Sequence, residues 1–258
     1  MNPAALSYPF LRHEFLQALE DSGSACEASG WYPIHLSLQQ HSDSAEGDSG
    51  SDSQSNAAVM PLYLKDHSMG EYVFDHAWAN AYYQNGLEYY PKLVTSIPFT
   101  PSMGPRVRTE QPLSQEECTQ LVDEVLAVAA DTGASGWHFL FPSVEHRQLF
   151  KDPRLLQRSG VQYHWHNRDY QHFDDFLVTM NSRKRKMVRK ERADVAAQGI
   201  RVSIELGADI SPDLWGLFYQ LYERTYAKRN GSRGYLTEAF FTQIARTMPE
   251  QIAMAYVV

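Results

Sequence analysis

The spacing of apolar residues along the chain predicts alternating helices and strands. Apolar side chains three or four residues apart predict helices at 9–23, 114–133, 173–180, 182–198, 212–226 and 237–248. Short apolar runs predict strands at 31–39, 58–64, 92–99, 137–141, 161–167, 200–206 and 251–258. Ser114, followed by Glu117, has the spacing of a capping box that starts a helix. This mixture predicts an α/β protein with mixed sheets flanked by helices.

The pattern breaks between the first two predicted strands. Residues 41–56 contain six serines and four acidic residues, with no lysine, arginine or bulky apolar side chain. Such a segment buries too little surface to offset the entropy of ordering it. We therefore expect a two-strand hairpin, 31–39 with 58–64, whose tip carries a disordered insertion at 41–57.

The order of elements is similar in the two halves of the chain. This predicts a first domain at 1–165 and a second at 166–258. The second half ends on an apolar strand that no further element follows. Because a terminal strand normally needs partners around it, we expect the second domain to be truncated.

Positive charge is concentrated in one segment. Residues 183–192 hold seven of the 23 basic side chains and one acid, so they carry +6 while the rest of the chain carries −14. Like charges in neighbouring helical turns repel, which favours a role in holding an anion. A solvated face or an interdomain strut is the structural alternative.

Arg185 and Arg189 lie four residues apart and share one face of the predicted helix. A guanidinium suits a diphosphate because its planar fork makes paired hydrogen bonds. Contact with RNA, including transfer RNA, remains open because a phosphate backbone asks only for clustered cations. DNA binding of the leucine-zipper type is not expected, since Gly199 ends the helix.

A tyrosine-rich segment at 71–93 is the second candidate for chemistry. Phe74 and Trp78 are predicted to be core residues. A buried tyrosine hydroxyl needs a partner, and the wall of a cleft supplies one. Candidate substrate-binding residues here are Tyr72, Tyr89, Tyr90 and Lys92. Asp75 is a candidate general base, although acyl transfer also proceeds by positioning alone.

Other signals exclude several classes of protein. His164 and His166 share a strand face but have no further ligand at metal-site spacing, so no metal is expected. Cys26 and Cys118 stand in no motif, which favours a reducing compartment. No signal peptide and no apolar run of spanning length is found, which predicts a cytoplasmic protein with at most peripheral membrane contact.

Three segments carry a resemblance to a known family. They are YPFLRHEFLQALEDSGS (8–24), GEYVFDHAWANAYYQNGLEYYPKLVTSIPFTPSMGPR (70–106) and the stretch from Tyr163 to Val202. Together they resemble the bacterial Fem-like family of peptidoglycan biosynthesis or recognition proteins. The resemblance implies two tandem acetyltransferase-like domains. It also implies transfer of an acyl or aminoacyl group to an amine of a phosphate-bearing acceptor, either a small molecule or lipid-linked.

The resemblance further implies where the substrates would lie. The acceptor is expected between a wall from Tyr72 to Arg106 and the basic helix, with its phosphates on Arg185 and Arg189. No permanently bound cofactor is expected; acyl-coenzyme A or aminoacyl-tRNA would be the donor. The loop Thr100–Arg106 has two prolines and so lacks the N–H groups of an ordinary coenzyme A cradle. A recognition protein without catalysis and RNA binding through the basic helix are the alternatives.

Overall fold

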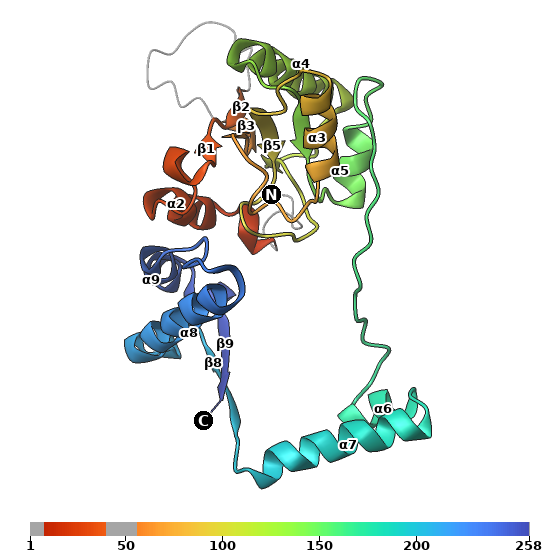
Figure 1. The fold of residues 1–258 in the computed structure, drawn as a ribbon, viewed down its shortest axis with the longest axis vertical. Coiled ribbons are helices and arrows are strands. Elements are labelled where there is room, and N and C mark those ends of the chain that lie inside the picture. The colour runs from red at the N-terminus through yellow and green to blue at the C-terminus, as the bar shows by residue number, and fades with distance from the viewer. Residues whose placement is uncertain (1–7, 40–55, 258) are drawn as a thin grey trace, which may run out of the picture.

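The computed structural model describes residues 8–39 and 56–257 (Figure 1). The predicted insertion at 41–57 therefore lies outside the described residues, apart from its last two positions. The chain is a mixed α/β protein, as expected. Within the described part, no helix is both long and apolar enough to cross a membrane.

The first half of the chain forms two small sheets. One has the order β1-β4-β5-β7 and the other β2-β3-β6. The strands are β1 (Tyr32–Pro33), β2 (Leu36–Gln39), β3 (Asn56–Met60), β4 (Tyr63–Lys65), β5 (Lys92–Thr95), β6 (Arg108–Thr109) and β7 (Trp137–Phe139). All neighbours are antiparallel except β5 and β7, which are parallel.

The predicted hairpin is confirmed, but each of its strands is divided. Leu36 pairs with Met60 in one sheet, and Tyr32 pairs with Leu64 in the other. The first strand is interrupted after Pro33, at residues 34–35, and the second is interrupted at Pro61, which has no N–H group to continue a ladder. One hairpin thus contributes strands to both sheets.

Helices cover these sheets. They are η1 (Pro9–Leu11), α2 (His13–Asp21), η2 (Glu27–Ser29), α3 (His76–Gln84), α4 (Gln115–Thr132) and α5 (Val144–Leu149). In α4 the hydroxyl of Ser114 accepts from the N–H of Glu117, whose carboxylate accepts from the N–H of Ser114. The predicted capping box is therefore confirmed. The apolar stripe of α4 packs against the sheets through the buried Leu121 and Val125.

The second half begins with an extended segment and two helices. The predicted strand at 161–167 is wrong: these residues form no strand, and Tyr163 is 99% exposed. An apolar, alternating sequence gives a strand only when a partner edge is available. The elements that follow are α6 (Phe173–Val178), α7 (Ser182–Ala197), β8 (Val202–Leu206), η3 (Gly207–Asp209), α8 (Pro212–Asn230), α9 (Glu238–Thr247), η4 (Pro249–Gln251) and β9 (Ala253–Val257).

The last two long helices pack on the first half of the chain. The ring of Phe240 in α9 meets Phe15 of α2 edge-on, with centroids 5.5 Å apart. Thr237, which caps α9, donates a hydrogen bond to the carbonyl of Ser22. β8 and β9 pair antiparallel below these helices. The division into two acetyltransferase-like domains at residue 165 remains a prediction.

Candidate functional site

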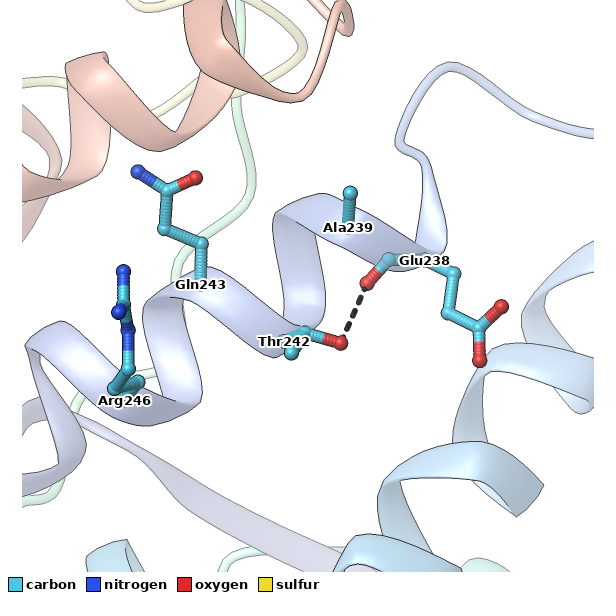
Figure 2. Close-up of a pocket in the computed structure, with 5 residues that line it drawn as sticks. All are labelled: Glu238, Ala239, Thr242, Gln243 and Arg246. Atoms are coloured by element: carbon cyan, nitrogen blue, oxygen red, sulfur yellow. Dashed lines mark hydrogen bonds between the residues drawn. The ribbon is translucent and has the colours of Figure 1, made fainter.

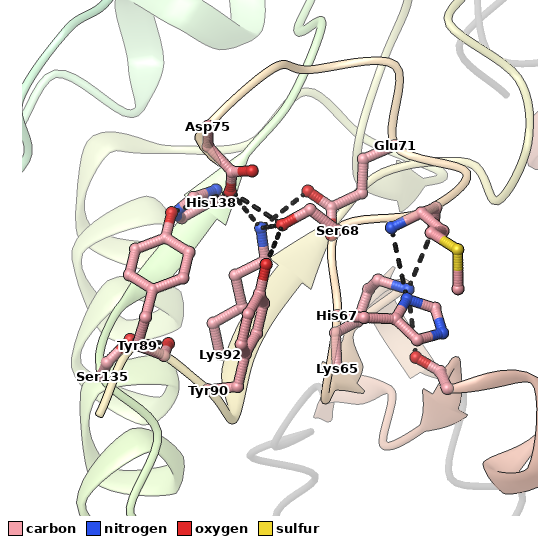
Figure 3. Close-up of polar contacts among 12 residues, drawn as sticks. Lys65, His67, Ser68, Glu71, Asp75, Tyr89, Tyr90, Lys92, Ser135 and His138 are labelled. Atoms are coloured by element: carbon pink, nitrogen blue, oxygen red, sulfur yellow. Dashed lines mark hydrogen bonds and ion pairs between the residues drawn. The ribbon is translucent and has the colours of Figure 1, made fainter. Parts of the chain in front are cut away.

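A buried ion-pair cluster lies where β5 begins (Figure 3). The ammonium of Lys92, the first residue of β5, lies 2.6 Å from Oδ2 of Asp75 and 2.8 Å from Oε2 of Glu71. It also donates to the hydroxyl of Ser68. None of the three charged side chains is exposed to solvent. An isolated buried charge costs many kcal/mol, so these groups hold the loop before α3 in one arrangement.

Two tyrosines join this cluster through their hydroxyl groups. Tyr89 donates to Oδ2 of Asp75 over 2.8 Å. Ser68 donates to the same oxygen, and the hydroxyl of Tyr90 lies 2.8 Å from that of Ser68. The structure therefore brings together four residues that the sequence singled out: Asp75, Tyr89, Tyr90 and Lys92.

The environment sets the charge state of the cluster. Burial would raise the pKa of Asp75, but hydrogen bonds from Lys92 and Tyr89 outweigh it and lower that pKa to about 2. Burial raises the pKa of Glu71, and burial together with the Asp75 carboxylate raises the pKa of Tyr89. Asp75 is therefore ionised near neutral pH. A carboxylate with so low a pKa is poorly matched to take up a proton as a general base.

Two carboxylate oxygens of the cluster lack hydrogen-bond partners. Oδ1 of Asp75 and Oε1 of Glu71 are buried, and no described residue donates to either. Buried polar atoms without a partner are uncommon in proteins. The cluster thus keeps two acceptor positions for donors that the described residues do not supply.

His138 is a member of the site that the sequence analysis missed. It lies on β7, and its Nε2 is 3.3 Å from the hydroxyl of Tyr89. Tyr89 gives its only proton to Asp75, so Nε2 must be the protonated nitrogen and Nδ1 carries the lone pair. Burial, followed by the charge of Lys92, lowers the pKa of His138 to about 4. The sequence held no signal for this role, because a single histidine in a short strand is unremarkable.

This cluster also contains three side chains of metal-ligand type. One ligand atom each from Glu71, Asp75 and His138 lies within 4.8 Å of the others. However, the ammonium of Lys92 already lies within hydrogen-bond distance of both carboxylates. Lys92 thus supplies a positive charge to both carboxylates in this structure.

Arg106 has a structural position. Its side chain is buried, and the guanidinium donates to the carbonyls of Leu140, Pro105 and Ser102. These bonds hold the loop that follows β5. Burial lowers the pKa of Arg106. Because its N–H groups donate to backbone carbonyls, Arg106 stabilises the loop, and its guanidinium is not presented on an open surface.

An aromatic surface, defined here as Phe74, Trp78 and Arg158, lies beside the cluster. The prediction that Phe74 and Trp78 are core residues is wrong, because they are 84% and 46% exposed. The guanidinium of Arg158 lies 5.5 Å from the centre of a Trp78 ring, a cation–π contact. Arg158 also contributes to the lowered pKa of His138. Trp78 and Arg158 thus present an aromatic ring and a cation together to solvent.

Tyr72 points away from the buried cluster. Its φ of 58° lies in the left-handed region, so that Glu71 is buried while Tyr72 is exposed. Burial and a hydrogen bond with Tyr72 raise the pKa of Tyr226 in α8 to about 12. Tyr72 thus contacts the second half of the chain.

The basic helix is not brought to this site. Figure 1 shows α6 and α7 apart from α3 and β5, at the far end of an extended segment, and no residue of α7 is buried. Arg189 pairs with Asp174 of α6. The expected cleft between the tyrosines and Arg185 and Arg189 is therefore absent among the described residues. A role of these arginines in binding phosphate stays a prediction.

An open pocket lies elsewhere, along α9 (Figure 2). It is lined by Glu238, Ala239, Thr242, Gln243 and Arg246. All five belong to one helix, and the interaction drawn among them is the bond from the Thr242 hydroxyl to the Glu238 carbonyl. This pocket brings no base or nucleophile close to a buried charge. We therefore place the candidate site at the Lys92 cluster.

Comparison with known proteins agrees with the resemblance found in the sequence. A FemAB-like family model, described as peptidoglycan biosynthesis/recognition, matches residues 2–257. No curated protein and no solved structure matches the chain.

Proposed function

Because the chain belongs to the FemAB-like family of peptidoglycan biosynthesis/recognition proteins, we propose that it transfers an acyl or aminoacyl group to an amine of a phosphate-bearing cell-wall precursor. The observation that supports this proposal is the buried Lys92 cluster, which fixes an exposed aromatic surface next to a neutral histidine. The donor would be acyl-coenzyme A or aminoacyl-tRNA. Both are substrates in this proposal, and neither is a resident cofactor.

The cluster gives the aromatic surface a fixed position. Asp75 occupies the position that caps α3, between Phe74 and the first turn that carries Trp78. Its ion pair with Lys92 is buried, so the two rings have a rigid base although their faces are in solvent. A rigid aromatic surface loses little conformational entropy on binding. Arg158 beside Trp78 adds a guanidinium that suits a phosphate group.

The proposed chemistry is attack of the acceptor amine on the acyl carbon of the donor. The bond between nitrogen and the acyl carbon forms, and the bond from that carbon to oxygen, or to sulfur in a thioester, breaks. The amine proton would pass to Nδ1 of His138 and then to solvent or to the leaving group. Tyr89 and Asp75 would hold the imidazole in the required tautomer. Most of the acceleration would come from positioning.

Recognition without turnover is the second candidate function. The low pKa of Asp75 and that of His138, about 2 and about 4, leave the cluster without a strong base near neutral pH. Such a site would bind the precursor through the aromatic surface alone.

The test is incubation of the chain with labelled acetyl-coenzyme A or charged tRNA and with precursors that bear a diphosphate and a free amine. Labelled product from the wild type, with turnover lowered and KM unchanged in His138→Gln, supports transfer. Precursor binding with no product from either donor supports recognition. If the chain neither binds the precursor nor forms product, both functions are refuted.

A further inference from the structure

Six of the seven cations of α7 lie on one half of the helix, and the seventh, Lys184, lies on the opposite side. At 100° per residue, Arg183, Lys186 and Lys190 form one stripe, and Arg185, Arg189 and Arg192 form the stripe next to it. The other residues on this half are small: Ser182, Ala193, Ala196 and Ala197. Both acids of the helix, Glu191 and Asp194, fall outside this half. We call these six basic side chains the cationic face.

Most of this charge is not neutralised within the chain. Arg189 pairs with Asp174, and Lys190 with Asp194, and all four side chains are more than half exposed. In the described part of the chain, no ion pair involves Arg183, Arg185 or Lys186. Exposed pairs contribute little to stability, so they are readily exchanged for another anion.

Apolar groups border the cationic face. The guanidinium of Arg192 lies 4.1 Å from the ring centre of Phe173, which ties the start of α6 to one edge of the face. Trp165 packs against Phe176 of α6 with ring centroids 5.9 Å apart. Exposed apolar side chains in this region are Trp165, Phe173, Val178 and Met187.

The position of α7 makes the face accessible to a large surface. Figure 1 shows α6 and α7 at the end of the molecule away from the first-half sheets. The stretch from 183 to 192 carries +6 and the remainder of the chain −14. The molecule is therefore strongly polarised. A negatively charged surface would attract α7 and repel the rest of the protein.

From this combination we propose that the cationic face of α7 docks on an anionic phospholipid bilayer, with the lipid phosphates on the six cations and the rings near α6 in the interfacial layer. Basic side chains bordered by tryptophan, phenylalanine and aliphatic groups are the composition that suits a membrane surface. This docking does not depend on the transfer reaction, because the Lys92 cluster lies in another part of the molecule.

RNA is the competing anion, and two observations favour lipid. Two of the exposed apolar groups on α6 and α7, Val178 and Met187, have no ring to stack on a base. The cationic face is also carried on a single exposed helix of 16 residues, about 24 Å long. A flat surface meets such a rod along its whole length.

The experiment is co-sedimentation of the full chain with vesicles of phosphatidylcholine alone and with 30 mol% phosphatidylglycerol added. Binding is expected only with phosphatidylglycerol and should fall steeply as salt is raised. The triple variant Arg183→Ala, Lys186→Ala and Lys190→Ala should bind roughly a hundredfold more weakly, at a factor of about five per cation. Alanine preserves the helix.

The matched control removes the same charge elsewhere, from the exposed Arg147, Lys151 and Lys228. It should keep wild-type binding. Equal loss in both triple variants, or no binding to phosphatidylglycerol vesicles at low salt, would overturn the proposal. So would release of the protein from vesicles by an equal phosphate concentration of single-stranded RNA, which would assign the face to nucleic acid.

Discussion

The ammonium of Lys92 lies 2.6 Å from Oδ2 of Asp75, with both side chains fully shielded from solvent. A second lysine, Lys65, is equally buried but has no carboxylate partner of this kind. It donates to the carbonyls of Gly30 and Met69 and lies 3.7 Å from the centre of a Trp31 ring. Burial lowers the pKa of Lys65 to about 7. The two lysines form a natural pair of positions for comparison.

Lys92→Met should lower the free energy of unfolding by about 3–5 kcal/mol, because it leaves Asp75 and Glu71 buried without their cation. Lys65→Met should lower the free energy of unfolding by markedly less, because burial already disfavours the charged form of Lys65. Urea unfolding at pH 7 measures both. An equal decrease in the free energy of unfolding for the two variants would show that the ion pair with Asp75 stabilises the protein no more than the contacts of Lys65 do.

Arg106→Lys should lower the free energy of unfolding by about 2–4 kcal/mol, because an ammonium cannot satisfy all the carbonyls that the guanidinium now bonds. Urea unfolding again gives the value. Precursor affinity, measured where the variant remains folded, should match the wild type. If Arg106→Lys were stable but bound the precursor more weakly, Arg106 would be a substrate-binding residue as the sequence predicted.

His138 should make the protein less stable in mild acid. Its pKa is about 4 when folded and near 6.5 when unfolded, so between these values the unfolded chain binds the extra proton and stability falls as pH decreases. On going from pH 7 to pH 5 this should remove about 1–2 kcal/mol. The neutral variant His138→Gln should lose correspondingly less stability over the same pH range.

His146, whose pKa burial also lowers, contributes to the same pH range in both proteins. The difference between wild type and His138→Gln therefore isolates His138. Identical pH dependence in the two would mean that His138 titrates normally and is not held neutral by its surroundings.

The sequence predicted most helices correctly because their signals are local. Ser114 and Thr237 cap α4 and α9 as their spacing indicates, and Gly199 follows the end of α7. Strand signals were less complete. The segment 161–167 has strand composition but no partner, and α3 was missed because its aromatic residues give no clear apolar stripe.

Part of the candidate site could also be predicted, and the rest could not. Asp75, Tyr89, Tyr90 and Lys92 are close in sequence, and the structure brings their polar groups together. His138 joins them only because β7 pairs with β5, a contact between distant segments. Burial of Arg106 and exposure of Phe74 likewise follow from tertiary packing, which composition does not reveal.

The role of the aromatic surface is measured by titrating a soluble, diphosphate-linked peptidoglycan precursor into the wild type and into Phe74→Ala with Trp78→Ala. The matched control is Tyr83→Ala with Leu87→Ala, which removes exposed side chains from another part of the same region. We expect both pairs to unfold within about 0.5–1 kcal/mol of the wild type. Precursor affinity should fall at least tenfold in the first pair only; unchanged affinity there, or equal loss in the control, would contradict the proposed binding surface.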